Sequence, residues 1–492
     1  MISSALQFVS RFWFLGALAA WAAALLGFGV IRLDTFGLDE GAARALLLNW
    51  SVSDNIVNPV LTMGPPDFRA LLFVPVGIYW AGNMLAAKML GLGLAFFAVS
   101  LLYRWASRLI GSEAAMVASA LLLVSPVLIA QIDSMGIGTY LLLGFALGVW
   151  LDTSYRAKPG YFGGWYFCQV LWMAVLITLH PMALAYPIAL AWRWLKTPDE
   201  HKTPRHMFIG IGLATSIALV LTWGWHDIAW FENPIRTLGN ATMGGVVFGA
   251  GDARWIAGTL LAAAALWLVF IERRKLGGDF GGQMLVLGLA IGCVAADSAW
   301  ATLVVALVLY FGIARLIGLG QIPGKRNFLG QRGLVTIVAF SMCTWFMLEA
   351  KAHAAAITLE ILSPQDELIR LLGEEAAHKD RPFRAASQWP GRSMLVCRRD
   401  VFPLPPAYDD PEELRKAIKG LTHVIFDPLD KKNKALADKF SAVAEETETM
   451  SLQKGGVLLA IRGNNVKMET RAPPTTTTAE PAAEPRPEGG KP

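Results

Sequence analysis

Two adjacent carboxylates, Asp39 and Glu40, are the residues in this sequence whose type and spacing best suit chemistry. They stand in the polar stretch 32–69, directly beyond the first long apolar run. One hypothesis makes Asp39 a general base that deprotonates an acceptor hydroxyl, a contribution typically worth about 10²–10⁴-fold in rate. The alternative is structural, because an Asp at this place caps the helix that follows and an acid in its first turn complements the helix dipole. The two interpretations are compatible, since a capping Asp is well fixed in position.

Other ionisable residues lie within or at the ends of apolar runs, namely Lys88, Asp133, His180 and Asp297. Such groups are costly in lipid and usually face a cavity or a partner. Lys88 could hold a lipid phosphate as a point charge. Asp133 and His180 are expected at the same membrane side as Asp39, so they could border one cavity with it. For each residue the plain alternative is an interfacial side chain that snorkels to water.

Basic residues outside the apolar runs are candidates for neutralising a leaving phosphate, on which charge builds as a sugar–phosphate bond breaks. Arg69 ends the first polar stretch, and Arg236 lies in the loop 226–254. Arg236 follows several Trp residues and Phe231, a combination that suits a sugar-phosphate site. An aromatic belt at the membrane interface would have the same composition.

The composition indicates a multi-pass membrane protein. Of the 492 residues, 54% are hydrophobic and only 16% are charged, whereas a soluble chain is nearer a quarter charged. The net charge of +5 needs no nucleic-acid partner, because basic cytoplasmic loops account for it. The four Cys lie far apart with no CxxC pair, so we expect neither a metal site nor a disulfide framework, and no cofactor.

Hydrophobic runs predict about eleven transmembrane helices, at 12–31, 85–103, 113–132, 140–150, 165–180, 182–194, 207–225, 255–271, 284–296, 299–316 and 334–350. The run 70–80 is too short to cross and suits a helix lying in the interface. Lys and Arg gather in alternate loops, which makes those loops and the N-terminus cytoplasmic. The first outer loop, 32–84, and everything beyond residue 350 are then on the outer side.

The chain changes character near residue 351, where charged residues become frequent. Residues 1–350 therefore form the predicted transmembrane module, and 351–470 form a small α/β domain. Its expected helices are 363–378, 411–419 and 433–446; its expected strands are 393–398 and 422–426, with a hairpin formed by 450–453 and 457–462. The tail 471–492 is rich in Pro, Thr, Glu and Ala and is predicted to be disordered.

Four short motifs, in order, carry a resemblance to a known family. They are LDEGAARAL (38–46), GPPDF (64–68), Ala87-Lys88-Met89 with the run 106–131, and LITLHPMALAYP (176–187). This order resembles the GT-C membrane glycosyltransferases, and within them the bacterial relatives of protein O-mannosyltransferases and of the lipid A aminoarabinose transferase. The match covers residues 10–200 best, and the C-terminal α/β domain fits the family's architecture.

The resemblance implies an inverting transferase that takes a sugar from a polyprenyl phosphate at the periplasmic side of a bacterial inner membrane. Asp39 matches the family's catalytic Asp, and Lys88 stands where the family usually has Arg. Three positions depart from the pattern: Gly64 replaces a His, Leu179-His180 replaces Lys-Gly, and Gly138 replaces an Asp.

The implied partners are the polyprenyl-phosphate sugar, membrane lipid, and a protein, lipid or glycan acceptor. Two rival functions remain open at this point. One is a transporter of lipid-linked sugars, and the other is a non-catalytic assembly protein whose outer domain binds a partner.

Overall fold

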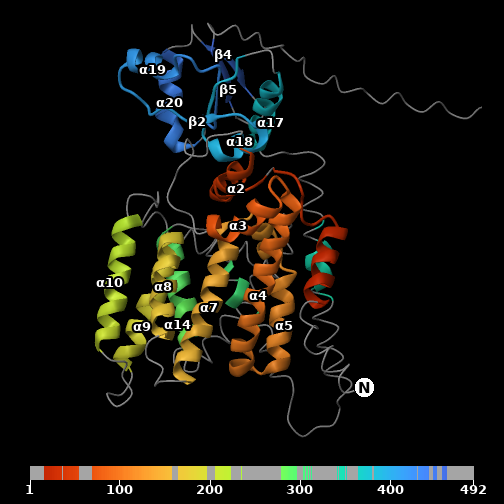
Figure 1. Ribbon diagram of the computed structural model, residues 1–492, viewed down its shortest axis with the longest axis vertical. Helices are drawn as coiled ribbons and strands as arrows, with labels where there is room; N and C mark the ends of the chain where they lie inside the picture. Colours follow the sequence, from red (N-terminus) through yellow and green to blue (C-terminus); the bar gives the residue numbers. More distant parts are fainter. Residues whose placement is uncertain are drawn as a thin grey trace, which may run out of the picture.

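The protein is a bundle of helices that carries an α/β unit at one end, as a computed structural model shows (Figure 1). The structure describes residues 16–35, 37–54, 69–157, 164–196, 205–222, 279–295, 364–378, 382–428, 430–442, 447–451 and 457–461, with the positions 234, 303, 304, 306–308, 310, 312, 341, 343–348 and 351.

Apolar helices make up the bundle: Gly16–Gly27, α4 (Met84–Ile110), α5 (Ser112–Leu123), α6 (Pro126–Asp133), α7 (Ile137–Ala157), α8 (Gly164–Leu179), α9 (Ala185–Lys196), α10 (Arg205–Thr222) and α14 (Phe280–Val294). Helix α4 packs against α5 and α7, α7 packs against α8, and α14 packs against α9. Among the described residues, α4 is long and apolar enough to cross a membrane. The α5–α6 pair, bent by 47°, would make a second such segment if it counts as one span.

Each predicted span that falls on described residues coincides with an apolar helix, but the run 113–132 is broken. Pro126 supplies no N–H, and Ser125 accepts a hydrogen bond from the Leu128 N–H at 3.2 Å, so a new helix starts there. The predicted span 255–271 lies outside the described residues, and 299–316 and 334–350 are described only in part. The total of eleven spans therefore stays a prediction.

Two short helices, α2 (Glu40–Asp54) and α3 (Arg69–Tyr79), lie between the bundle and the α/β unit (Figure 1). The predicted cap is confirmed, since the Ala42 N–H donates to Asp39 Oδ1 at 3.0 Å. Helix α3 confirms the predicted short helix at 70–80. It lies close against α2 at Gly77, where an added Cβ would be 2.7 Å from the Asn49 Cβ and 2.9 Å from its backbone oxygen.

The α/β unit is a five-stranded sheet in the order β2-β1-β3-β5-β4 with helices on both faces. Strands β2, β1 and β3 are parallel, whereas β5 runs antiparallel to β3 and β4. Its elements are α17 (Pro364–Ala377), β1 (Ala385–Ser387), α18 (Pro390–Cys397), β2 (Val401–Pro403), α19 (Pro411–Ile418), β3 (His423–Phe426), α20 (Lys431–Ala442), β4 (Thr447–Ser451) and β5 (Val457–Ile461). The buried side chains of α19 and α20 form one core cluster, while those of α17 and α18 belong to the core that continues into the bundle.

One element of this unit was predicted wrongly. The stretch 393–398, expected as a buried strand, is part of helix α18, and the strands β1 and β2 that flank it have three residues each. The helix is buried, so its apolar run resembles a strand, and Pro390 at its first position favours a helix start. The three predicted helices, the strand β3 and the hairpin are confirmed. The predicted tail 471–492 lies outside the described residues.

Replacing Gly77 by Ala should destabilise the protein, because the new methyl group meets the Asn49 backbone, which cannot turn away as a side chain can. Overpacking of this kind costs about 1–3 kcal/mol. The measurement is the unfolding midpoint of the purified full-length protein in detergent. Gly93→Ala in α4 is the matched control, since nothing lies within 4 Å of its Cβ position. Equal midpoints for the two variants would contradict the tight α2–α3 contact.

Candidate active site

The turn between α6 and α7 is where most of the predicted site residues meet. It is tight: Met135 has φ 54°, and the Gly136 N–H donates to the Gln131 backbone oxygen at 2.8 Å. The Gln131 side chain accepts the Gly138 N–H at 3.1 Å, which ties the start of α7 to the end of α6. This turn presents its backbone oxygens toward the polar stretch that follows the first apolar run.

Asp39 is held against this turn by its backbone and by one carboxylate oxygen. Its N–H donates to the Ser134 oxygen at 2.8 Å. Oδ1 accepts the Ala42 N–H and forms an ion pair with Arg69 Nη1 at 2.7 Å. The Asp39 side chain is 38% exposed and that of Arg69 only 4%. Within the described part of the chain both side-chain contacts of Asp39 fall on Oδ1. The carboxylate is therefore oriented, while Oδ2 stays unused.

Arg69 is the buried cation beside this carboxylate. It is the first residue of α3, and its Nη1 also donates to the Met135 oxygen at 3.0 Å. Its guanidinium lies 5.9 Å from the centroid of the Tyr140 ring, a cation–π geometry. Arg69 thus links Asp39 to the α6–α7 turn.

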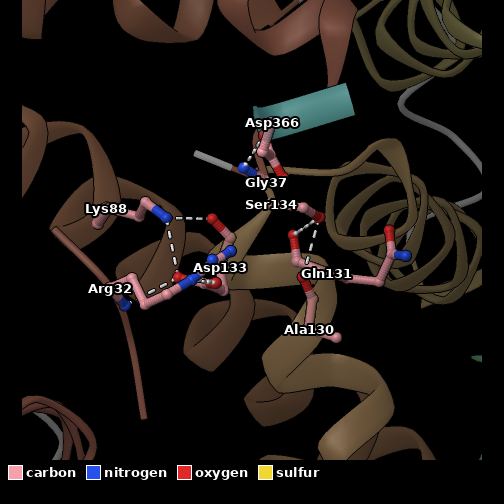
Figure 2. A network of polar contacts seen from close by, with 8 residues as sticks. All are labelled: Arg32, Gly37, Lys88, Ala130, Gln131, Asp133, Ser134 and Asp366. Carbon is pink, nitrogen blue, oxygen red and sulfur yellow. Dashed lines mark hydrogen bonds and ion pairs between the residues drawn. The ribbon is translucent and has the colours of Figure 1, made fainter. Parts of the chain in front are cut away.

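Asp133 forms a buried cluster with Lys88 and Arg32 on the other side of the turn (Figure 2). Oδ1 of Asp133 lies 2.9 Å from Lys88 Nζ and accepts the Arg32 N–H at 2.9 Å, and Oδ2 accepts Arg32 Nε at 2.9 Å. Lys88 Nζ also donates to the backbone oxygen of Asp133. Lys88 is 0% exposed, so its ammonium faces protein acceptors in this arrangement.

Arg32 was not singled out by the sequence analysis, although it is the first residue of the polar stretch. A basic residue directly after an apolar run is typical of an anchor at the membrane interface. Its pairing with Asp133 is seen in the fold and not in the local sequence. Two cations share the Asp133 carboxylate, and the Asp34 carboxylate is close enough to act on Lys88 as well.

Glu40 points away from this turn, toward the α/β unit. Its Oε1 accepts the Gly391 N–H at 2.7 Å and Arg44 Nε at 3.0 Å, and its Oε2 accepts the Arg392 N–H at 3.1 Å. Burial raises the pKa of the Glu40 carboxyl above its usual value, and the Arg44 charge and the two backbone N–H groups oppose that shift. Both oxygens of this predicted site residue are thus engaged in joining two parts of the chain.

Of the remaining predicted site residues, the structure describes His180. His180 follows α8 and caps the 3₁₀ turn Pro181–Leu184, its Nδ1 accepting the Met182 N–H at 3.3 Å. Arg236, Asp297 and the motif at 64–68 lie outside the described residues. No group of three or more His, Cys, Asp or Glu side chains that could hold a metal ion occurs in the part of the chain that the structure describes.

Comparison with known proteins identifies the fold. No family model matches the sequence, and neither does any curated protein. The structure resembles apo ArnT from Cupriavidus metallidurans, with a TM-score of 0.54 and 14% identity over 93% of this chain and 98% of ArnT. ArnT bound to undecaprenyl phosphate gives a TM-score of 0.55 and 14% identity over 90% of this chain and 98% of that one. The apo oligosaccharyltransferase of Archaeoglobus fulgidus gives 0.50 and 11% identity over 93% and 75% of the two chains.

These structures are GT-C glycosyltransferases, so the resemblance read from the sequence motifs is confirmed at the level of the fold.

Replacing Asp133 by Asn should destabilise the protein strongly, because it leaves Lys88 and Arg32 buried without their shared carboxylate. Removing one partner of a buried ion pair costs about 3–5 kcal/mol. The measurement is the unfolding midpoint of the full-length protein. Glu374→Gln, which breaks the exposed ion pair with Arg370, is the reference variant. Adding Lys88→Met to the Asp133→Asn variant should restore part of the loss, since one unpaired charge is removed. A midpoint unchanged in Asp133→Asn would show that the cluster is solvated.

Proposed function

We propose, from the GT-C fold of this chain, that it is a glycosyltransferase that moves a sugar from a polyprenyl-phosphate donor to an acceptor hydroxyl. The observation that carries the proposal is Asp39, a partly exposed carboxylate oriented on one oxygen by a helix cap and a buried Arg69, while its other oxygen has no partner among the described residues. The donor class is supported by ArnT, which shares the fold over nearly its whole length and was solved with undecaprenyl phosphate bound.

In the proposed reaction Asp39 acts as the general base. Its Oδ2 takes the proton of the acceptor hydroxyl while the hydroxyl oxygen forms a bond to the anomeric carbon of the sugar. The bond between that carbon and the phosphate oxygen breaks on the opposite face, and its electron pair leaves with the lipid phosphate, so the anomeric configuration inverts. Base assistance of this kind is worth about 10²–10⁴-fold.

The developing charge on the leaving phosphate is balanced by the buried cations at this end of the bundle. Arg69 lies directly beside Asp39, and the cations Arg32 and Lys88 meet at Asp133, next to the same α6–α7 turn. Fixed charges in a site of low water content stabilise such a transition state well. Lys88 contributes through the charge of this cluster, and direct contact with phosphate requires its release from Asp133. Arg236 stays a candidate for the same role.

The proposed setting is a bacterial inner membrane with the reaction on the periplasmic side. Residues 1–350 form the multi-pass module with a cytoplasmic N-terminus, and 351–470 form the periplasmic unit. The arrangement of α4 supports this, because Lys88 near its start contacts Asp133 beside the turn that holds Asp39. Arg104 and Arg108 lie toward its other end, about 30–36 Å from its first residue. Basic residues favour the cytoplasmic side.

A second candidate is a non-catalytic assembly protein, and one observation favours it. Lys88, the residue expected to meet the donor phosphate, is fully buried and bonded to Asp133. A protein that keeps the fold without the reaction has no need of an open phosphate site.

Asp39→Asn separates the two candidates. Turnover of a panel of polyprenyl-phosphate sugars is measured as release of the lipid phosphate, with lipid, glycan and protein acceptors supplied. We expect the variant to lose about 10²–10⁴-fold in turnover. Asn still caps the helix, but it leaves the charge of the buried Arg69 unpaired, so the unfolding midpoint should fall and turnover is compared per folded protein.

Asp409→Asn is the matched control, an exposed carboxylate of the α/β unit 3.6 Å from Lys439 Nζ. It should turn over like the wild type. Full turnover by Asp39→Asn would reduce Asp39 to a helix cap. Absence of turnover in the wild type with every donor and acceptor would favour the assembly protein.

A further inference from the structure

The start of helix α18 is capped by a residue that is 351 positions away in the chain. The first N–H groups of a helix have no partner inside it and are normally satisfied by a nearby Ser, Thr, Asp or Asn. Trp389 at the cap position provides no side-chain bond, and Pro390 has no N–H. The next two N–H groups, of Gly391 and Arg392, both donate to the carboxylate of Glu40.

The surfaces around this bond fit closely. A Cβ at Gly391 would lie 2.8 Å from Arg44 Cγ, 2.9 Å from Glu40 Oε1 and 3.3 Å from the Arg44 backbone nitrogen. Glycine therefore allows the start of α18 to rest directly on the first turn of α2. At the other end of the same contact, the Arg398 guanidinium lies 5.8 Å from the Trp50 ring centroid.

A second attachment lies on the other side of Asp39. The Gly37 N–H donates to Asp366 Oδ1 of α17 at 3.0 Å, and the same oxygen pairs with Arg392 (Figure 2 shows the Gly37–Asp366 bond). The Asp366 and Arg392 side chains are both buried. Helices α17 and α18 thus hold the chain at Gly37 and Glu40, two residues before Asp39 and one residue after it.

We propose that the α/β unit positions the Asp39 carboxylate for the transfer reaction, with Glu40 as the positioning residue through which it acts. The inference rests on the proposed function and assigns a role in it to residues that touch no substrate. The bundle holds Asp39 itself, through Ser134 and Arg69, whereas the α/β unit holds the Gly37 backbone before it and the Glu40 side chain after it. Without the contacts from the α/β unit, the first turn of α2 is held by its contacts with the bundle. A displacement of about 1 Å at a catalytic group can lower a rate about 100-fold.

The test uses three variants of the full-length protein that leave the side-chain contacts of Asp39 intact. Gly391→Ala separates α18 from α2 sterically, Glu40→Ala removes the cap, and Glu40→Gln keeps one good acceptor oxygen. The controls are Gly93→Ala, whose Cβ position is open, and Glu374→Gln on the exposed surface of α17. Docking is read as hydrogen-exchange protection of the Gly391 and Arg392 amides, independently of activity.

We expect Gly391→Ala and Glu40→Ala to lose that protection and to lower kcat by about 10–100-fold, with the KM for the polyprenyl-phosphate donor within twofold of wild type. Glu40→Gln should lie between them and the wild type, a graded rescue that mere loss of folded protein does not produce. It also keeps the test decisive if Gly391→Ala fails to fold. Both controls should keep wild-type protection and kcat.

Wild-type kcat in variants that have lost amide protection would overturn the inference and leave the link as a simple structural attachment. Wild-type amide protection in Glu40→Ala would also overturn it, because the cap would then not hold α18. Failure of the proposed function looks different: the wild type itself shows no turnover although its two amides are protected.

Discussion

Buried charge at one end of the helical bundle has to be paired within the protein, and the surrounding geometry follows from that requirement. Transferring an unpaired ammonium or carboxylate out of water costs several kcal/mol even after relaxation. Lys88 and Arg32, from α4 and from the end of the first apolar run, therefore converge on Asp133 at the end of α6. These ion pairs fix the position of the α6–α7 turn. The backbone oxygens of the turn then accept the hydrogen bonds of Asp39 and Arg69.

The adjacent acids Asp39 and Glu40 serve different neighbours because of helix geometry. Asp39 is the cap and Glu40 the first residue of α2, and their side chains leave the backbone in different directions. Asp39 turns to Arg69 at the bundle, while Glu40 turns to the start of α18. The bonding of the carboxylate oxygens follows the same division. Among the described residues, both oxygens of Glu40 have partners, whereas one oxygen of Asp39 has none. In the proposed reaction, this acid pair joins a reactive carboxylate to a structural one.

Local signals let the sequence predict a large part of this arrangement. The Asp39 cap, the short helix α3 and the three other helices of the α/β unit are set by residues within a few positions, as caps and periodicity are. Helix α18 was predicted wrongly as a strand. Its first N–H groups are capped by Glu40, and no local pattern around 390–397 can reveal so distant a partner. The pairing of Asp133 with Lys88 and Arg32 joins residues 45 and 101 positions apart, so the sequence placed Lys88 at a phosphate rather than in an ion pair.

The Lys88–Asp133 pair also bears on how a phosphate could be held. Lys88 donates to the carboxylate and to the backbone oxygen of the same residue, which occupies two of its three N–H groups. An incoming phosphate would have to compete with both acceptors, or be attracted to the two cations from outside the cluster. The second course needs no rearrangement, because Asp133 retains Arg32 on its other oxygen. A lysine at this position fits that course. A point charge suffices for attraction at a distance, whereas bidentate binding of phosphate calls for the planar fork of Arg.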